Sequence, residues 1–456
     1  MHIKKSLFLL ILVFASFWII FVGLQNDTIF DESLGRICNN WENINGERKL
    51  VDQPFTEVDN ENYVRWDAVH YKLIKDNWYS VELAGGEYIY AFFPLFPLIW
   101  KFSFLPPLGI LFLNYSFFVI AILIFSNLLS STKSYINNIL IACSLPSLIV
   151  FFIPYTEATF LLMSAIGTYG FVRKKYAVFF IGFLLASLTR SAYVFIVLSF
   201  ICAELFFFFE HKKIMTLLKN TFLRIAPLLI GTAIASIVQL ISGSSSLTTF
   251  IDVQETWEHV LGMPHHLRDW SQESFSMNIG VLILILIPIV AFTVQKALTQ
   301  LKKIKEPATT EVEDRKYYLV ILSLCYLVLL TLFIIFFQGG NLHTLYRYTI
   351  STPFFYILLF AAYPLVVDLA KNFKSFTISV LSLIAVFILG LADFSTEWNF
   401  CDMGLFLIIL SCIFWLFQEH STKRIYKYSL YASILLNLVW TCYLFNSYIV
   451  DAWIFV

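Results

Sequence analysis

The chain has 456 residues, of which 59% are hydrophobic and only 14% are charged. Because an ordinary soluble protein is roughly 25% charged, this composition excludes a soluble globule, a disordered chain and a disulfide-rich secreted scaffold. Lys and Arg together number 31, as do Asp and Glu, so the basic footprint of nucleic-acid binding is missing and a polytopic α-helical membrane protein remains.

Residues 6–24 are apolar and follow Lys4 and Lys5. The run is bulky throughout and lacks a small-residue cleavage site, which favours a retained membrane anchor over a signal peptide. The long polar stretch at 25–91 comes next and is expected to form the first extracytoplasmic loop. Residues 92–107 are apolar but carry four prolines, which predicts a broken re-entrant or interfacial segment.

The loop contains the string RWDAVHY at 65–71. On a helix, Asp67, His70 and Tyr71 share one face, while Trp66 and Val69 lie on the other side. This pattern predicts an amphipathic helix at the membrane surface. The alternative is that Asp67 is one more solvated acid in an acidic loop.

Thirteen apolar runs predict an all-α bundle of about 11–13 transmembrane helices in a single domain over 1–456. The runs lie near 6–24, 108–130, 136–153, 158–172, 176–190, 191–208, 222–242, 278–298, 317–337, 346–368, 375–394, 403–418 and 428–449.

The basic residues predict the orientation. With the N-terminus in the cytoplasm and 92–107 not crossing, 21 of the 31 Lys and Arg residues fall on the cytoplasmic side, as the positive-inside rule requires. Most of the chemically unusual residues then lie in the extracytoplasmic loops, so an active site is expected on the non-cytoplasmic face.

Two charged residues interrupt the apolar runs in the first half of the chain. Glu157 follows Pro154 and Tyr155, and it is either a helix cap or part of a site. Arg190 splits the stretch from 176 to 208. An arginine near membrane depth is costly, so it needs an anion. Its candidate partners are Asp67, Glu157 or a lipid phosphate, and a plain buried ion pair is the alternative to a functional role.

Further polar residues occur in two later loops. Gln254 and Trp257 lie between apolar runs, and His343 precedes Arg347 by four residues, so these two can share a helix face. With Arg190 they would form a cationic pocket for a phosphate at the bilayer surface. The alternative for Arg347 is an interfacial anchor whose guanidinium group extends to water.

Neither a metal nor a cofactor has a signature. No C-x-x-C or H-x-x-x-H spacing occurs among the seven cysteines and eight histidines, and no nucleotide-binding loop or zinc-protease motif stands in a usable context. We therefore expect no cofactor and no divalent metal. Cys38 and Cys401 both fall in polar loops, where a disulfide between them stays an open alternative.

Taken in order, these strings resemble the PIG-V-like mannosyltransferases of the GT-C superfamily of membrane glycosyltransferases. The matching strings are RWDAVHY at 65–71, AFFPLFPL at 91–98, PYTEATF at 154–160, SLTRSAY at 187–193, the Q-x-x-W of Gln254 to Trp257, and YRYTISTP at 346–353. The eukaryotic members that mannosylate GPI anchors carry N-P-A-S where this chain has Ser144 to Ser147. The SLTRSAY string of this chain is more similar to bacterial relatives.

The resemblance implies a GT-C-type bundle and an inverting transfer of a mannosyl or similar residue from a polyprenyl- or dolichyl-phosphate sugar. It implies that Asp67 is the general base. The acceptor would be a glycolipid or another molecule on the non-cytoplasmic face. The residues expected to bind the substrate or its phosphate are Arg65, His70, Tyr71, Glu157, Arg190, Gln254, Trp257, His343 and Arg347.

Two other functions stay open on the sequence alone, namely a lipid or sugar transporter or flippase, and a non-catalytic membrane subunit. A transporter commonly shows inverted repeats or paired broken helices, whereas this chain has one strongly proline-broken segment. We expect a multi-pass protein of the bacterial cytoplasmic membrane, with the endoplasmic reticulum as the alternative. The partners expected are the bilayer, the lipid-linked sugar and the acceptor, without nucleic acid.

Overall fold

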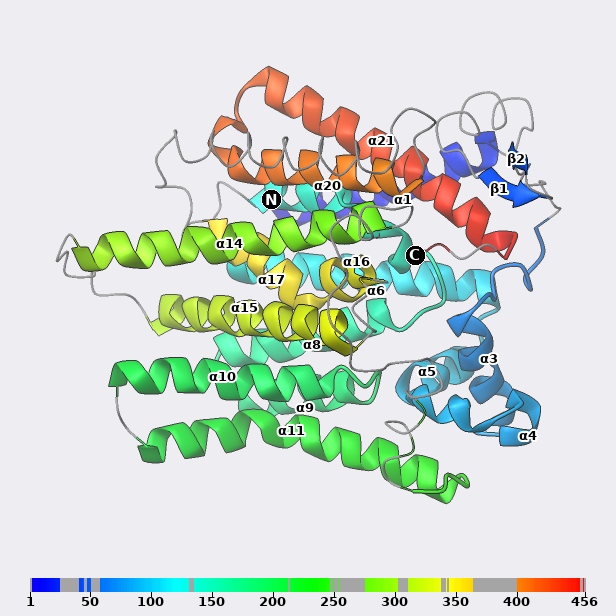
Figure 1. Cartoon of the computed structure of the whole chain (residues 1–456), viewed down its shortest axis with the longest axis horizontal. Coiled ribbons are helices and arrows are strands. Elements are labelled where there is room, and N and C mark those ends of the chain that lie inside the picture. The colour runs from blue at the N-terminus through cyan, green and yellow to red at the C-terminus, as the bar shows by residue number, and fades with distance from the viewer. Residues whose placement is uncertain are drawn as a thin grey trace.

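The computed structural model describes residues 2–24, 41–44, 47–50, 58–130, 135–211, 214–246, 249, 253, 275–301, 311–337, 342, 344–363, 400–451 and 454. These residues are predominantly helical (Figure 1). The strands found among them are β1 (Trp41–Ile44) and β2 (Glu47–Leu50), which pair as an antiparallel hairpin in the first loop. The polar stretch thus contains a hairpin that the expectation of an all-α protein did not include.

Within the described ranges, six helices are long and apolar enough to cross a membrane, which confirms a helical multi-pass membrane protein. They are α1 (His2–Leu24), α6 (Pro107–Leu129), α11 (Ile214–Ile241), α14 (Phe275–Leu301), α15 (Glu311–Phe337) and α21 (Arg424–Ile449). Shorter apolar helices accompany them: α7 (Tyr135–Ser144), α8 (Glu157–Val172), α9 (Tyr176–Ser187), α10 (Tyr193–His211) and α20 (Phe400–Leu416). The run expected at 375–394 lies outside the described residues.

Two apolar runs that the sequence predicts as single spans are broken at prolines. The run at 136–153 becomes α7 and the 3-10 helix η3 (Pro146–Phe151). The run at 346–368 becomes α16 (Leu345–Ile350) and α17 (Pro353–Ala361), with Thr352 extended before Pro353. A residue before proline is driven out of the helical region, so apolar length alone was the wrong criterion at both places.

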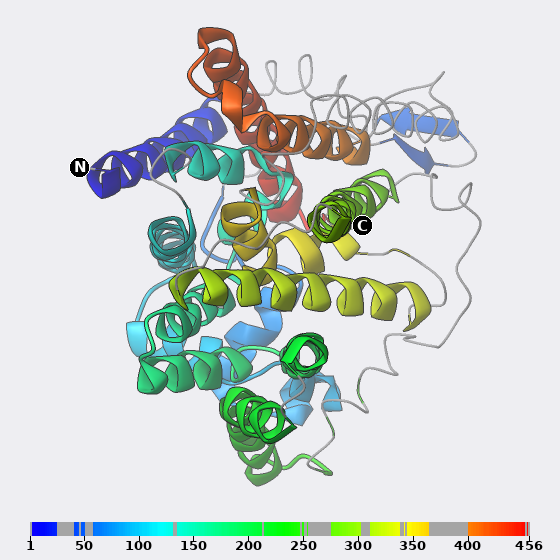
Figure 2. The same cartoon turned by 90° about the vertical axis from the view of Figure 1, so that its left-hand side faces the viewer.

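The segment at 92–107 forms a short helix, α5 (Leu95–Ser103), followed by a turn into α6. It lies beside α3 (Asp67–Asn77), α4 (Val81–Ala84) and the 3-10 helix η2 (Glu87–Ala91) at one end of the molecule (Figure 1). Figure 2, viewed from the opposite end, shows these helices behind the longer ones. A helix of nine residues is far shorter than the roughly 20 residues that a membrane span needs.

Glycines let α8, α9 and α11 approach one another closely. A Cβ atom on Gly182 of α9 would lie 2.3 Å from the backbone nitrogen of Gly167 in α8, and one on Gly170 would lie 2.2 Å from that of Phe179. On α11, Gly231 faces α9 just as tightly. Small residues at such crossings are the usual means of packing membrane helices. Because α8 and α9 form a tight hairpin, the start of α8 and the end of α9 lie at the same end of the molecule.

The remaining described helix is η5 (Gln418–His420), a 3-10 turn between α20 and α21. The packed helices share one large apolar core, in which Phe118, Phe151 and Tyr356 form a continuous set of ring contacts between α6, η3 and α17. This core fixes the ends of the helices relative to one another, and the candidate site lies at those ends.

The two ends of the α8–α9 hairpin are expected on opposite faces of the membrane. Arg173, Lys174 and Lys175 form the exposed turn after α8, and such a basic turn is retained in the cytoplasm. Glu82 is exposed on α4, which contacts α3, and α3 contacts the start of α8 through Tyr71 and Thr156. An impermeant thiol reagent should label Glu82→Cys in intact cells and Arg173→Cys only after permeabilisation. The unsubstituted chain gives the background, and labelling of both cysteines from one side would contradict this arrangement.

Candidate functional site

Four charged residues from distant segments form one network. Arg347 of α16 donates from Nη2 to Oδ2 of Asp67 at 2.6 Å and from Nε to Oε1 of Glu157 at 2.9 Å. Arg190, in the turn between α9 and α10, places Nη1 3.2 Å from the same Glu157 oxygen. The two guanidinium and two carboxylate groups balance in charge. The arginines thus converge beside the Asp67 helix, and Glu157 is the anion that Arg190 requires.

The four side chains of the network differ in their exposure to solvent. The side chains of Glu157 and Arg347 are 1% and 4% exposed, whereas those of Arg190 and Asp67 are 18% and 28% exposed. The second oxygen of Glu157, Oε2, is buried and has no hydrogen-bond partner among the described residues. Buried ions are stable only when they are paired. Glu157 is therefore the fixed centre of the network, and Asp67 is its edge toward water.

Asp67 is the first residue of α3, as the RWDAVHY pattern predicts a helix there. The preceding Trp66 has a φ of 52°, a left-handed value that is unusual for a bulky residue and marks a backbone held by its surroundings. The helix buries Ala68, Tyr71 and Ile74. Trp66 and Val69 are exposed, so the apolar side expected opposite Asp67 does point away from the core.

The proline-rich segment supports this helix. The ring of Tyr71 lies 5.1 Å from that of Phe92 and 5.2 Å from that of Phe96, and the backbone nitrogen of Leu95 donates to the carbonyl oxygen of Leu188 at 3.1 Å. The Tyr71 hydroxyl lies 3.3 Å from Oγ1 of Thr156. The segment therefore joins the Asp67 helix to the turn that carries Arg190, and Tyr71 joins the same helix directly to the start of α8, where Glu157 lies.

The surroundings of His70 and Tyr71 keep both side chains uncharged. The His70 ring lies 4.6 Å from Phe92 and 5.3 Å from Tyr88. Burial lowers the pKa of His70 below its usual value, and the Asp67 carboxylate opposes this shift only in part. His70 is thus uncharged at neutral pH. Burial, together with Asp67 and Glu157, raises the pKa of the Tyr71 phenol, so this hydroxyl keeps its proton.

Arg65 faces the C-terminal end of α21. Its Nε donates to the carbonyl oxygen of Ile449 at 3.1 Å, and its backbone nitrogen donates to the Tyr448 hydroxyl at 3.1 Å. The same hydroxyl lies 3.1 Å from the carbonyl oxygen of Tyr63. Arg65 therefore fixes the entry to α3 through contacts nearly 400 residues away in the chain.

Arg347 is held in place from several sides. Its guanidinium carbon lies 4.7 Å from the centre of the Tyr155 ring, a cation–π distance. The backbone nitrogen of Tyr346 donates to Oδ1 of Asn278 at 2.9 Å, and the Tyr346 hydroxyl donates to the carbonyl oxygen of Ile454 at 2.7 Å. Thr344, just before α16, has a φ of 58°. The two helices that carry Asp67 and Arg347 thus both begin after a left-handed non-glycine residue.

Sequence reasoning missed Asn114, Asn278 and Tyr448. Asn114 on α6 donates from Nδ2 to the carbonyl oxygens of Ile153 at 2.6 Å and Tyr155 at 3.0 Å, and so shapes the turn before Glu157. A polar residue within an apolar run was a usable signal for both asparagines. Nothing distinguished Tyr448 among 23 tyrosines. Gln254, Trp257 and His343 lie outside the described residues, as does Cys38.

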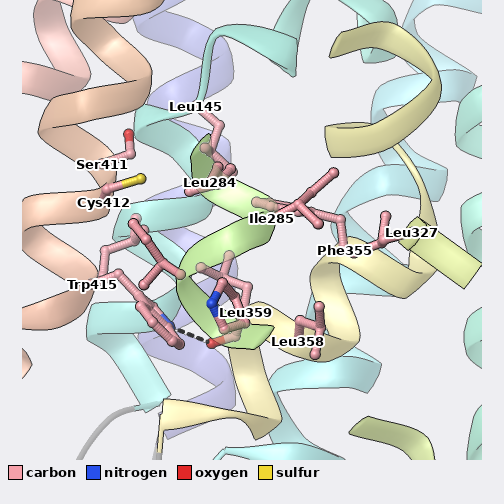
Figure 3. A pocket seen from close by; sticks show the side chains of 13 residues that line it. Leu145, Leu284, Ile285, Leu327, Phe355, Leu358, Leu359, Ser411, Cys412 and Trp415 are labelled. Carbon is pink, nitrogen blue, oxygen red and sulfur yellow. Dashed lines mark hydrogen bonds between the residues drawn. The ribbon is translucent and has the colours of Figure 1, made fainter. Parts of the chain in front are cut away.

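An apolar crevice lies between α14, α17 and α20 (Figure 3). Its volume of about 40 Å³ is far below the roughly 300–1,000 Å³ of a ligand pocket. The Ser411 hydroxyl there bonds to that of Ser144, and Nε1 of Trp415 donates to the carbonyl oxygen of Leu359 (Figure 3). The residues that line the crevice include no charged group.

Comparison with known proteins adds no relative: no family model, curated protein or solved structure matches this chain. Within the described ranges, no three His, Cys, Asp or Glu side chains are grouped so as to hold a metal ion. The groups present at the network are two carboxylates and two guanidinium groups, with Tyr71 and Tyr155 beside them.

Arg347→Gln should lower the free energy of unfolding by about 3–5 kcal/mol, because it leaves a buried carboxylate short of its partner. Denaturation of the purified protein in mixed micelles measures this change. Arg173→Gln, which alters an exposed arginine at the far end of α8, should change it by less than about 0.5 kcal/mol. Equal stability of the two variants would show that the network contributes nothing to folding.

Proposed function

We propose that this protein is an inverting glycosyltransferase of GT-C type. It would move a mannosyl or similar residue from a polyprenyl-phosphate sugar to a lipid-linked or other acceptor at the non-cytoplasmic face. The finer fold belongs to the same proposal: about 11–13 membrane spans, to which the shorter apolar helices would contribute. A bacterial cytoplasmic membrane is the setting that the sequence favours.

One observation carries the proposal. Asp67, Glu157, Arg190 and Arg347 come from four different strings that resemble the PIG-V-like family, and all four lie in one ion-pair network. Strings that matched by chance would have no reason to bring their charged residues together. The network also has the two kinds of group that the reaction needs, a carboxylate that reaches water and paired guanidinium groups.

The reaction makes definite demands on these groups. The acceptor hydroxyl attacks the anomeric carbon from the face opposite the phosphate, and its proton passes to a carboxylate oxygen of Asp67. The bond between the anomeric carbon and the phosphate oxygen breaks, and its electron pair stays on that oxygen. A phosphodiester with about one negative charge thereby becomes a phosphate monoester that carries between one and two. Arg190 and Arg347 would stabilise this developing charge.

The donor must change the pairing of Arg347. In the resting network, Arg347 binds the Asp67 carboxylate, so a donor phosphate that binds Arg347 competes with Asp67. Its arrival would release the carboxylate, which could then accept a proton. The base would become available only when the donor is in place. Glu157 would remain bound to both arginines and keep them oriented.

Asp67→Asn should lower sugar transfer by about 10²- to 10⁴-fold, the usual contribution of a positioned base. The amide oxygen can still accept from Arg347, so folding should persist. The assay is transfer of labelled mannose from polyprenyl-phosphate-mannose into lipid by membranes that contain the protein.

Asp76→Asn is the matched control, because Asp76 is exposed and its carboxylate pairs with the neighbouring Lys75. If Asp67→Asn stays near-normal while Glu157→Gln abolishes transfer, Glu157 is the base. If neither variant changes transfer, the glycosyltransferase proposal fails, and movement of a fluorescent lipid across reconstituted vesicles would then test for a flippase.

Arg190→Lys and Arg347→Lys should each lower transfer by roughly 10- to 100-fold, because loss of a hydrogen bond to a charged group costs about 1.5–3 kcal/mol. A lysine keeps the charge but cannot contact two oxygens through a planar fork. Initial rates over a range of donor concentrations measure the effect. Arg173→Lys is the control. Unchanged rates in both site variants would show that neither guanidinium group contributes to transfer.

A further inference from the structure

A charged cavity lies at the opposite end of the α8–α9 hairpin from the Asp67 network. Its volume is about 760 Å³, well within the range of ligand sites and far above a packing void. Helices α8, α10, α11 and α15 contribute to its wall. The charged residues that line it are Lys174, Glu204, Arg224, Glu311, Asp314 and Arg315.

Arg224 of α11 is held firmly at the cavity wall. It forms an ion pair with Glu204 of α10, and the two side chains are only 19% and 5% exposed. Its guanidinium carbon lies 4.0 Å from the centre of the Tyr318 ring and 5.2 Å from that of Phe171. The guanidinium group is therefore oriented before any ligand arrives.

Arg315 of α15 reaches the same place from another helix. Its Nη1 donates to the carbonyl oxygen of Phe171 at 2.6 Å, and its Nη2 lies 3.2 Å from Oε1 of Glu311. Its guanidinium carbon is 5.8 Å from the centre of the Phe171 ring. Two guanidinium groups from different helices thus contact one ring, and each is paired with a carboxylate of the cavity wall, Glu204 or Glu311.

The balance of charge restricts the ligand. Three basic and three acidic side chains line the cavity, so no surplus of positive charge exists for a polyanion such as a nucleotide. A ligand with one phosphate and one ammonium group could contact both the basic and the acidic side chains of the cavity. The phosphate would meet Arg224 and Arg315. The ammonium group would meet Asp314 and Glu311. The Glu311 side chain is 60% exposed and also pairs with Lys174 and Arg315.

The location indicates the source of such a ligand. The cavity lies where α8 ends and where α11 and α15 begin, at the basic end of the bundle. Beside it, α11 exposes Met215, Leu218 and Phe222, which are 76%, 59% and 67% exposed. Exposed apolar surface of this kind faces lipid chains in a membrane protein. Phosphate and ammonium groups occur together at that depth in lipid headgroups.

We propose that this cavity binds the headgroup of an ethanolamine phospholipid from the cytoplasmic leaflet, with its acyl chains along α11. The lipid would join α8, α10, α11 and α15 at the end remote from the Asp67 network. This inference concerns a separate site and does not rest on the proposed glycosyl transfer.

Native mass spectrometry of the full chain, released from nanodiscs of defined composition, tests the proposal. Phosphatidylethanolamine should remain bound at one site and should outcompete phosphatidylglycerol of equal chain length. Arg315→Gln should weaken lipid retention by about tenfold or more, as expected for lost charge-assisted hydrogen bonds. The double variant Glu204→Gln with Arg224→Gln, which replaces an ion pair by two uncharged side chains, should have the same effect.

Arg173→Gln is the matched control, since Arg173 is exposed at the same end but does not line the cavity. Arg315 is the safer substitution because its side chain is 26% exposed, and thermal unfolding verifies that each variant is folded. The proposal is overturned if folded Arg315→Gln retains the lipid as the control does. Preference for phosphatidylglycerol, or no retained lipid in the parent chain, would overturn it equally.

Discussion

A buried guanidinium group cannot lose its proton, and the structure around Arg347 follows from that constraint. With a side chain only 4% exposed, Arg347 needs anions within contact distance, and Asp67 and Glu157 both pair with it. Their carboxylates come from the first loop and from the start of α8. One cation therefore connects α3, α8 and α16, which are far apart in sequence. The cost of removing these ions from water is several kcal/mol each, so such a network persists only where the backbone holds every member in place.

The scaffold that holds them is built from smaller contacts. Gly167, Gly170 and Gly182 let α8 and α9 pack backbone to backbone, which brings Glu157 and Arg190 to one end. Asn114 satisfies two carbonyl oxygens in the turn before Glu157. Tyr448 binds the backbone on either side of Val64 and so fixes the approach to Asp67. Each contact is worth little alone, yet together they determine which charges meet.

The sequence identified the members of the network but not their pairing. Glu157, Arg190 and Arg347 stood out because a charge beside an apolar run is costly and needs an explanation. Asp67 stood out because it shares a helix face with His70 and Tyr71. Three partners were open for Arg190, and only the packing of α8 on α9 decides for Glu157. The spacing of Asp67, His70 and Tyr71 also predicted an amphipathic helix, which is α3. Residues whose role is to hold the backbone, such as Asn114 and Tyr448, carry no comparable cost and so gave a weak signal or none.

Proline explains where the predicted helices were wrong and where they were right. Pro146 and Pro353 interrupt apolar runs and the chain breaks there, whereas Pro227 and Pro288 lie inside the continuous helices α11 and α14. A proline within a membrane helix is tolerated when neighbours satisfy the freed carbonyl group. Hydropathy does not report on those neighbours. Hydropathy alone therefore does not predict which prolines break an apolar run and which lie inside a continuous helix.

The difference in exposure between the two carboxylates bears on which of them can act as a base. Glu157 accepts from both arginines and is 1% exposed, so leaving its partners would strand a charge in the protein interior. Among the described residues Asp67 pairs with Arg347, and it is 28% exposed, so water can solvate it when a phosphate takes its place on Arg347. A pair at 4 Å is worth about 4 kcal/mol at an effective dielectric constant of 20, which a phosphate on the same guanidinium can replace. Of the two, Asp67 is the carboxylate that can exchange partners at low cost, and Glu157 is the one that must stay.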